Sequence, residues 1–345
     1  MLKKKIALIF GVTGQDGAYL SKFLLKKGYV VHGVKRRASQ PNTYRVDDIY
    51  KDPLVKKSNF FLHYGDVTDS ISVFSIINKI KPSEIYNLAA QSHVAVSFDL
   101  PEYTTNADAS GTLRILESIN RIDKKIKFYQ AGSSEMFGKV VESPQNEKTP
   151  FYPRSPYGVA KVYAHWITVN YREAYNIFAC NGILFNHESP IRGETFVTKK
   201  IIQGLIRIKH GNQKKLFLGN LYSKRDWGHA KDYVEAMWKM LQQKKPNDYV
   251  IGTGKTFMIK EFVNKAAKKI GFKIKWLGKG INEKAINIEN KKVLIECKKR
   301  YFRPVEVDYL KANAKKAKKI LNWSPKISID NLIDEMIEHE IKNLS

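Results

Sequence analysis

Cysteine is scarce in this sequence. Its 345 residues include two, Cys180 and Cys297, and they do not form a C-x-x-C pair. Two isolated cysteines cannot build a thiolate zinc cluster, and the eight histidines show no H-x-x-x-H arrangement. We therefore expect no metal site.

Long apolar runs are also lacking. The longest, such as Ile6–Phe10, are much too short to cross a bilayer. A basic N-terminus precedes this run, as in a signal peptide, but Gly11 and Thr13 interrupt the run too early for one. The sequence therefore predicts a cytoplasmic protein that has no membrane partner.

Acidic residues are few compared with basic ones. Lys and Arg number 60 and Asp and Glu 33, which gives a formal net charge of +27. A charge of this size can indicate a basic nucleic-acid-binding protein, and we keep that as the non-enzymatic alternative. However, the lysines are spread along the chain, and the run Lys315–Lys319 lies in a helical pattern typical of a solvated face. We favour a lysine-rich surface and no nucleic-acid partner.

Short apolar runs alternate with amphipathic stretches in the first half of the chain. Strands are predicted at Ile6–Phe10, Val30–Val34, Phe60–Tyr64, Glu84–Ala89, Lys127–Gln130 and Ala179–Phe185. Helices are predicted near residues 17–27, 69–80, 105–121 and 156–175. This alternation indicates an α/β fold with a doubly wound parallel sheet of the Rossmann type. Such sheets bind ligands at the carboxyl ends of their strands.

Three glycines follow the first predicted strand at a regular spacing. The G-x-x-G-x-x-G segment contains Gly11, Thr13, Gly14, Gln15, Asp16 and Gly17. Glycine permits a tight turn and lets backbone N–H groups approach a pyrophosphate. The partial positive charge of the following helix N-terminus favours the same anion. A glycine loop alone is a weak signal, but between a first strand and a first helix it predicts a dinucleotide site.

Two arginines follow the second predicted strand. NAD enzymes usually have an acid here that binds the ribose 2′-hydroxyl, whereas this chain has Arg36 and Arg37. Guanidinium groups bind a 2′-phosphate through paired, charge-assisted hydrogen bonds, so the sequence predicts NADP as the cofactor. Further cofactor candidates after the third and fourth strands are Asp66, Val67, Leu88, Ala89 and Ala90. In isolation Asp66 would be a turn residue; beside a cofactor it can accept from an adenine amine.

Tyr157 and Lys161 form a Y-x-x-x-K pair. Residues four apart share one face of a helix. An ammonium beside a phenol stabilises the phenolate, so we expect Lys161 to lower the pKa of Tyr157. Such a tyrosine can take a hydroxyl proton while hydride leaves the same carbon for a nicotinamide.

Ser133 and Glu135 follow the fifth predicted strand. Ser133 can hydrogen-bond the substrate oxygen that becomes a carbonyl. A simple oxidoreductase or a 4-epimerase needs no carboxylate at position 135, because it moves only hydride and one hydroxyl proton. A dehydratase must also remove a proton beside the new ketone and help water leave, and one carboxylate can serve as base and then acid. The structural alternative is an acid favoured at a helix N-terminus.

Longer blocks of the sequence resemble the GDP-mannose 4,6-dehydratase family. They are Arg36–Ser39, Ser92–Phe98, Ser133–Gly138, Asn181–Pro190, Gly193–Ile201, Arg225–Tyr233 and Arg300–Val307. The resemblance runs from the first strand to about residue 307. It implies an extended short-chain dehydrogenase/reductase, a hydro-lyase that converts GDP-mannose to GDP-4-keto-6-deoxymannose by moving hydride from C4 to C6.

The resemblance also implies residue roles. Ser133, Glu135, Tyr157 and Lys161 match the catalytic positions, where the family has Thr in place of Ser133. The implied cofactor contacts are Tyr103, Lys161, His187 and Arg192. The implied GDP-sugar contacts are Ser92, Asn186, Lys200, Arg225, Arg303 and Glu306. Arg225 and Arg303 also suit a diphosphate on chemical grounds alone.

The domain division is predicted from the residue pattern, which loosens after Pro190, and the assembly from the resemblance. We expect an NADP-binding Rossmann domain over 1–190, to which 226–252 returns. A smaller, mixed α/β domain over 191–225 and 253–345 would bind the GDP-sugar. In the family the Arg-Arg-x-Ser loop reaches a neighbouring subunit's cofactor, so the resemblance implies a homotetramer.

Two departures from the family leave the sugar open. Besides Ser133, Gly132 stands where the family often has Ser or Ala, and we expect looser packing near the sugar. GDP-heptose is therefore an alternative substrate. Dehydration of dTDP-glucose is another, although those dehydratases typically have Asp where this chain has Ser134.

Overall fold

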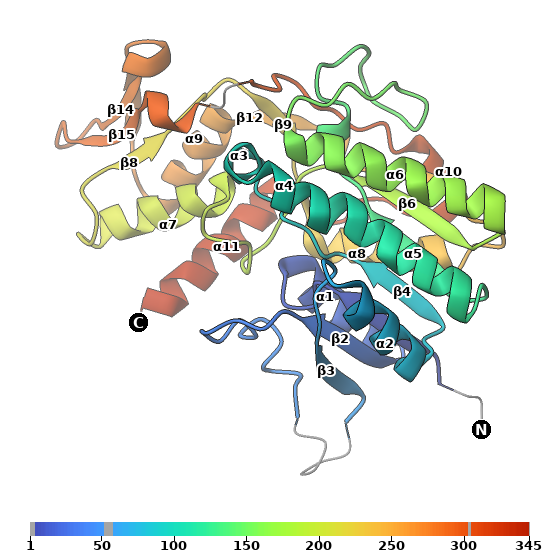
Figure 1. Ribbon diagram of the computed structural model, residues 1–345. Helices are drawn as coiled ribbons and strands as arrows, with labels where there is room; N and C mark the ends of the chain where they lie inside the picture. Colours follow the sequence, from blue (N-terminus) through green and yellow to red (C-terminus); the bar gives the residue numbers. More distant parts are fainter. Residues whose placement is uncertain (1–3, 52–57, 303–304, 345) are drawn as a thin grey trace.

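A parallel sheet of seven strands forms the centre of the larger part of the molecule (Figure 1). The computed structural model describes residues 4–51, 58–302 and 305–344. In spatial order the strands are β11 (Asp248–Ile251), β6 (Ala179–Leu184), β5 (Lys127–Ala131), β4 (Glu84–Asn87), β1 (Ile6–Phe10), β2 (Val30–Lys35) and β3 (Phe60–Tyr64). Every neighbouring pair is parallel. The predicted α/β fold with a doubly wound sheet is confirmed.

Helices cover both faces of this sheet (Figure 1). Side chains alternate along β1, as the strand period of two requires. Ala7 and Ile9 belong to the core shared with α1 (Gln15–Lys26) and α8 (Ala230–Leu241). Leu8 and Phe10 belong to the opposite core. The helices of that second face are α2 (Ser70–Ile80), α5 (Gly111–Ile122) and α6 (Pro156–Tyr175).

Two elements differ from the sequence prediction. The strand expected at Glu84–Ala89 ends at Asn87. Beyond it the backbone runs against Gly11, where an added Cβ would lie 2.8 Å from the Ala89 nitrogen. The helix expected near 105–121 is interrupted: it begins as α4 (Pro101–Thr104), widens into the π-helix η1 (Thr105–Ser110) and continues as α5. A single period of 3.6 residues does not reveal such a widened turn.

A smaller sheet and three helices build the rest of the molecule. The sheet has the order β13 (Ile274–Leu277), β14 (Lys284–Asn287), β15 (Val293–Cys297) and β8 (Leu216–Leu218). The helices are α7 (Val197–Lys209), α9 (Ile259–Ile270) and α11 (Ile329–Leu344). These elements share a core of their own that includes Ile202, Leu216, Phe262 and Ile333.

Several short elements complete the structure. They are α3 (Val94–Asp99), η2 (Ser134–Met136), β7 (His187–Glu188), β9 (Lys224–Asp226), β10 (Gly228–His229), β12 (Thr256–Met258), η3 (Gly280–Asn282), η4 (Lys299–Tyr301) and α10 (Lys315–Leu321). Between them the chain returns through α8 and β11 to the large sheet, where β11 pairs with β6. Most ligand-binding candidates therefore lie where the two parts meet.

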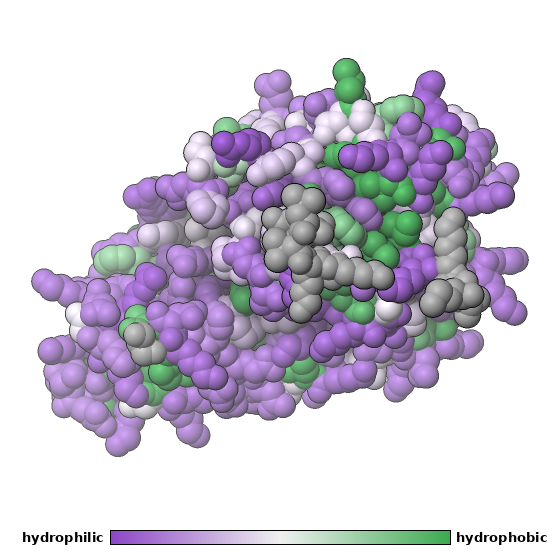
Figure 2. Space-filling view, turned by 90° about the horizontal axis from the view of Figure 1, so that it is seen from below, coloured by the Kyte–Doolittle hydropathy of each residue, from purple (hydrophilic) through white to green (hydrophobic). Residues whose placement is uncertain are grey.

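The face seen in Figure 2 is predominantly hydrophilic. Figure 2 shows hydrophilic residues over most of one face, with a smaller hydrophobic area. Within the described ranges, no helix has both the length and the apolar character needed to cross a membrane.

Candidate functional site

One open cleft contains most of the candidate residues. It has a volume of about 1060 Å³ and extends from the carboxyl ends of β1, β4 and β5 to α7 and η4. The candidates that line it are Gly11, Gly14, Gln15, Asp16, Gly17, Leu88, Ala90, Ser92, Ser133, Glu135, Tyr157, Lys161, Asn186, His187, Arg192, Lys200, Arg225 and Glu306. Residues more than 290 positions apart in the sequence therefore line the same cleft.

The glycine loop approaches its neighbours more closely than any side chain would allow. Gly11 has a φ of +80°, and an added Cβ there would lie 2.8 Å from the Leu88 oxygen. A Cβ at Gly17 would lie 2.5 Å from the Gly11 oxygen. The N-cap of α1, Gly14, makes no side-chain cap hydrogen bond, so the N–H groups of the first turn can approach an anion. These features fit the pyrophosphate of a dinucleotide.

Seven cofactor candidates do not line the cleft: Thr13, Arg36, Arg37, Asp66, Val67, Ala89 and Tyr103. Arg36 donates from Nη1 to the Tyr103 hydroxyl, so the fold brings these two candidates together. Arg37 is exposed, and its Nη1 donates to the Ala38 oxygen. The Thr13 oxygen accepts from Arg45 Nη1 at 3.2 Å.

The candidates after β3 and β4 have mainly structural contacts. Asp66 Oδ1 accepts from the Thr68 backbone nitrogen at 2.9 Å and from its hydroxyl at 2.8 Å, as a turn residue does. Val67 is buried and Ala89 partly buried in the core beneath α2 and α5. Arg303 lies outside the described residues.

An ion pair joins the glycine loop to β7. His187 Nε2 lies 2.7 Å from Asp16 Oδ2. Burial opposes a charge on His187, but the Asp16 carboxylate outweighs burial and raises the pKa of His187. Burial also opposes the charge of Asp16, and His187 reverses this, so the pKa of Asp16 is lowered. The Gln15 amide donates to the His187 oxygen at 3.2 Å, which strengthens the same link.

Arg192 contacts a carboxylate and an aromatic ring close to β7. Its Nε lies 3.1 Å from Glu188 Oε2, and its guanidinium lies 3.7 Å from the centroid of the Phe196 ring. Thr198 donates to the same Glu188 oxygen at 2.7 Å. The side chain of Arg192 is thus oriented by both a carboxylate and an aromatic face.

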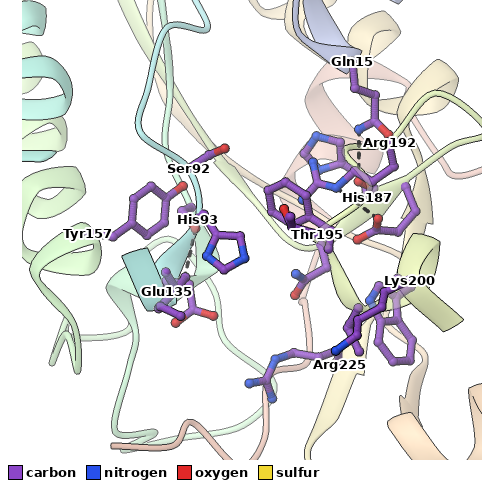
Figure 3. A pocket seen from close by; sticks show the side chains of 18 of the residues that line it. Gln15, Ser92, His93, Glu135, Tyr157, His187, Arg192, Thr195, Lys200 and Arg225 are labelled. Carbon is purple, nitrogen blue, oxygen red and sulfur yellow. Dashed lines mark hydrogen bonds and ion pairs between the residues drawn. The ribbon is translucent and has the colours of Figure 1, made fainter. Parts of the chain in front are cut away.

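The catalytic candidates come from two capped helix starts. Ser133 is the N-cap of η2, and its hydroxyl accepts from the Glu135 nitrogen at 3.2 Å. Ser155 is the N-cap of α6, accepts from the Gly158 nitrogen at 3.0 Å and precedes a proline at N1. These caps place Glu135 and Tyr157 at the same end of the cleft. Figure 3 shows both side chains there, with Ser92 and His93.

The prediction that the pKa of Tyr157 is lowered is wrong for this structure. Burial raises the pKa of Tyr157, and the Asp108 carboxylate adds to the increase. The Lys161 ammonium lies 5.7 Å from the centroid of the Tyr157 ring, donates to the Ala131 oxygen at 3.1 Å and lies 3.9 Å from Asp108 Oδ2. The hydrogen bond between Ser133 and Tyr157 acts in the opposite direction and favours the phenolate.

Basic side chains gather at the far end of the cleft. Arg225 lies on β9, which pairs with β12, and its side chain is largely buried. Lys200 Nζ lies 3.6 Å from the centroid of the Tyr301 ring, and burial lowers the pKa of Lys200. Figure 3 shows Lys200 across the cleft from Tyr157.

Several lining residues were not among the sequence candidates. They include His93, Thr195, Arg207, Asn220, Arg300 and Tyr301. His93 lies directly after Ser92, and Arg300 and Tyr301 belong to a block quoted above, so their neighbours were a usable signal. Arg207 and Asn220 lack such a signal, because the packing of α7 against β8 brings them to the cleft.

The packing at Gly132 is tight and not loose as expected. An added Cβ would lie 2.9 Å from the Gly182 oxygen and 3.2 Å from Met136 Cε. A side chain at this position would therefore press against β6 and η2. For metals, no cluster of three or more His, Cys, Asp or Glu side chains suited to an ion occurs within 4–51, 58–302 and 305–344.

Comparison with protein families gives a match over nearly the whole chain. Residues 8–336 match the family described as GDP-mannose 4,6 dehydratase. The GDP-mannose 4,6 dehydratase of Drosophila melanogaster is 57% identical over 343 residues, which cover 99% of this chain and 87% of the relative. The GDP-mannose 4,6-dehydratase of Sinorhizobium fredii is 54% identical over 346 residues, covering 100% and 99%.

Solved structures share the fold at lower identity. A UDP-glucose 4-epimerase of Thermotoga maritima, solved with UDP-glucose, has a TM-score of 0.81 at 21% identity and covers 99% of this chain and 100% of its own. A dTDP-glucose 4,6-dehydratase of Bacillus anthracis, solved with NAD, has a TM-score of 0.80 at 21% identity, with coverage of 98% and 97%. Epimerases and dehydratases thus share this architecture, and the side chains of the cleft must distinguish their chemistry.

Proposed function

The chain belongs to the GDP-mannose 4,6-dehydratase family, and from this premise we propose that it converts GDP-mannose to GDP-4-keto-6-deoxymannose. The observation that carries the proposal is the position of Glu135. It lies at the same end of one cleft as Tyr157 and Ser133, while cationic groups line the other end. Oxidation at one carbon would leave this carboxylate without a task, whereas dehydration requires a group that takes and returns a proton.

NADP is the proposed cofactor. The support is the glycine cradle, which has no room for a Cβ at Gly11 or Gly17, and the pair of Arg36 and Tyr103 at the end of β2. Arg36 and Arg37 would hold the 2′-phosphate. Asp66, Val67, Leu88 and Ala90 would line the adenosine and ribose, and Lys161, His187 and Arg192 the nicotinamide half. When bound, the nicotinamide supplies a reversible hydride acceptor.

The proton transfers are assigned to Tyr157 and Glu135, and Ser133 is assigned a binding role. Tyr157 Oη takes the proton of the C4 hydroxyl, and the Ser133 hydroxyl binds the same sugar oxygen. The C4 ketone makes the C5 proton acidic, and Glu135 removes it. The Glu135 carboxylic acid then protonates the C6 hydroxyl, which leaves as water. The alkene that remains needs a hydride at C6, which the bound nicotinamide would supply, and a proton at C5, which Tyr157 can return. Burial of Glu135 limits access of bulk water to these steps.

The GDP-sugar is assigned to the far end of the cleft. Lys200 and Arg225 would bind the diphosphate, with Arg303 as a third cation. Asn186 Oδ1 lies buried without a hydrogen-bond partner in the described part of the chain, and it can accept from a sugar hydroxyl. Ser92 would bind the sugar, and Glu306 the guanine or its ribose. We assign 1–190 with 226–252 to the cofactor and 191–225 with 253–345 to the GDP-sugar.

A homotetramer is the proposed assembly. Its support is a row of exposed apolar side chains on one face of α6, formed by Val159, Tyr163 and Trp166, which are 56%, 43% and 57% exposed. A large apolar surface of this kind suits burial between subunits.

The proposed compartment is the cytoplasm, because Cys180 and Cys297 are both free, as is usual in a reducing environment.

Product analysis tests the proposed function. Purified protein is supplied with GDP-mannose, GDP-heptose or dTDP-glucose, and products are identified by mass spectrometry. GDP-mannose should give a product lighter by one water, formed without net consumption of NADP. Turnover of GDP-heptose or dTDP-glucose in place of GDP-mannose would contradict the assigned substrate, and an epimer of unchanged mass would contradict dehydration.

A further inference from the structure

The π-helix η1 brings an acidic residue into the protein interior. Asp108 lies within η1 and is 1% exposed. Single π-turns are rare and occur often at functional sites, and a buried carboxylate is costly unless other groups compensate its charge. The contacts of Asp108 therefore indicate what the widened turn is for.

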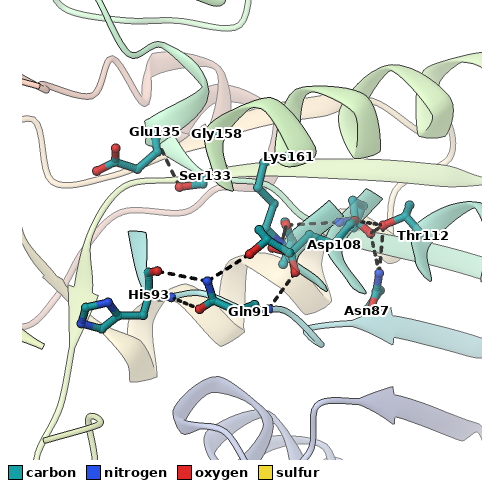
Figure 4. Close-up of polar contacts among 12 residues, drawn as sticks. Asn87, Gln91, His93, Asp108, Thr112, Ser133, Glu135, Gly158 and Lys161 are labelled. Carbon is teal, nitrogen blue, oxygen red and sulfur yellow. Dashed lines mark hydrogen bonds and ion pairs between the residues drawn. The ribbon is translucent and has the colours of Figure 1, made fainter. Parts of the chain in front are cut away.

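The two oxygens of Asp108 have different surroundings. Oδ1 accepts a hydrogen bond from the Gln91 backbone nitrogen at 2.7 Å. Oδ2 is buried, has no hydrogen-bond partner in the described part of the chain and lies 3.9 Å from Lys161 Nζ. The side chains of this pair are 0% and 3% exposed, so little solvent screens their attraction. Figure 4 shows Asp108 between Lys161 and Gln91.

Gln91 extends this contact to the edge of the cleft. Its Oε1 accepts from the His93 nitrogen at 2.8 Å, and its Nε2 donates to the His93 oxygen at 3.1 Å and to the Thr104 hydroxyl at 3.2 Å. Ser92 and His93 both line the cleft. One carboxylate thus orients both Lys161 and the loop that carries Ser92 and His93 (Figure 4).

The charges around Asp108 favour an ion pair with Lys161. Burial lowers the pKa of Lys161, and the Asp108 carboxylate opposes that change. Burial raises the pKa of Asp108 to about 6, against the attraction of Lys161. Each charge of the pair thus stabilises the other against the effect of burial.

Other charged groups near the pair act mainly on Tyr157 or on the outer side of η1. Glu135 of η2 raises the pKa of Tyr157, and Arg192 lowers it. From α5, Arg114 reaches the outer side of η1, where it donates to the Asn106 oxygen at 3.1 Å. The charged partner of Asp108 is therefore Lys161 of α6.

We propose that Asp108 is a positioning residue for the dehydration: its carboxylate is the counter-ion that keeps Lys161 an ammonium near Tyr157, and through Gln91 it holds the Ser92 and His93 edge of the cleft. This inference rests on the proposed function for its effect on turnover. The ion pair itself is independent of the substrate, so it has its own readout.

Two substitutions separate the charge of Asp108 from its hydrogen bond. Asp108→Asn keeps an acceptor for the Gln91 nitrogen but removes the charge. Lys161 then loses its proton at lower pH, so the alkaline limb of kcat should move down by about one pH unit or more while KM changes little. Asp108→Ala removes both contacts and should raise KM as well.

Thr112→Val is the matched control. Thr112 is buried next to η1, and its hydroxyl donates to the Asp108 backbone oxygen at 2.9 Å without touching the carboxylate. This variant should melt at a lower temperature and keep the wild-type pH profile. An unshifted profile in Asp108→Asn, or an equal shift in Thr112→Val, would overturn the proposal.

A second measurement needs no folded variant at Asp108. In wild-type protein labelled with ¹³C at lysine Cε, the Lys161 signal is identified by its loss in Lys161→Met. It should report an ammonium throughout the pH range in which the enzyme is active. A neutral Lys161 in that range would contradict the ion pair even if GDP-mannose turns over. An ammonium in a protein that does not dehydrate GDP-mannose would leave the ion pair standing and refute only the proposed function.

Discussion

The two ends of the cleft use positive charge differently. At the catalytic group and at the glycine loop, each cation considered above has a carboxylate close by: Lys161 faces Asp108, and His187 pairs with Asp16. At the far end, Lys200 lies instead over the Tyr301 ring, and Arg207 and Arg300 also line the cleft. The first arrangement is oriented by the protein itself, as catalysis requires. The second provides positive charge that a diphosphate can neutralise.

Substitution at the catalytic end should give the largest effect on turnover. Glu135→Gln keeps the size of the side chain but removes its ability to take and return a proton, so kcat should fall on the order of a hundredfold or more. The affinity for GDP, measured by calorimetry, should stay close to that of wild type. Glu173→Gln, at an exposed position on α6, is the control. Turnover near the wild-type rate in Glu135→Gln would remove this residue from the mechanism.

Substitution at the far end should affect binding instead. Arg225→Ala should weaken GDP binding by about 2 kcal/mol, or roughly thirtyfold, because a buried cation that faces a diphosphate is lost. Cofactor retained on purification should not change. Lys231→Ala is the control, since Lys231 pairs at the surface with Glu335 at 3.0 Å and such pairs contribute little. Equal GDP affinity in Arg225→Ala and wild type would erase the contrast between the two ends.

Cofactor choice is expected to depend on a site outside the cleft lining. Arg36→Ala should lower the affinity for NADP relative to NAD by about 1.5 kcal/mol, or roughly tenfold, through loss of a charged hydrogen bond to the 2′-phosphate. Fluorescence titration with both cofactors measures this ratio. Arg121→Ala, which breaks a surface pair with Glu117, should leave the ratio unchanged, and an unchanged ratio in Arg36→Ala would disprove the role of Arg36.

The smallest effect concerns stability at the glycine loop. The pKa of His187 is raised above its ordinary 6.5 by Asp16. Its contribution to stability is therefore complete below pH 6.5 and declines as the pH rises through the folded-state pKa. Asp16→Asn should cost on the order of 1 kcal/mol at pH 6 and less at pH 9. Thermal melts at both pH values measure this, and an equal or larger loss at pH 9 would show that the pair is not ionic.

The sequence predicts the parts of this molecule that depend on local pattern. The strands and the Gly11 loop follow from residues close together in the chain. The pairing of Lys161 with Asp108 joins residues 53 positions apart and depends on a π-turn, which has no simple periodic signature. The pKa of Tyr157 was predicted in the wrong direction because burial is a property of the folded chain.

Transfer of the C4 hydrogen tests the central claim most directly. The enzyme is given GDP-mannose deuterated at C4, together with an equal amount of unlabelled GDP-mannose, and the products are examined by mass spectrometry and NMR. Dehydration within one site predicts deuterium at C6 of the product, in the same molecules that began with it and without free NADPH. Deuterium that appears in free NADPH, or that is absent from C6, would show an ordinary dehydrogenase and contradict the account.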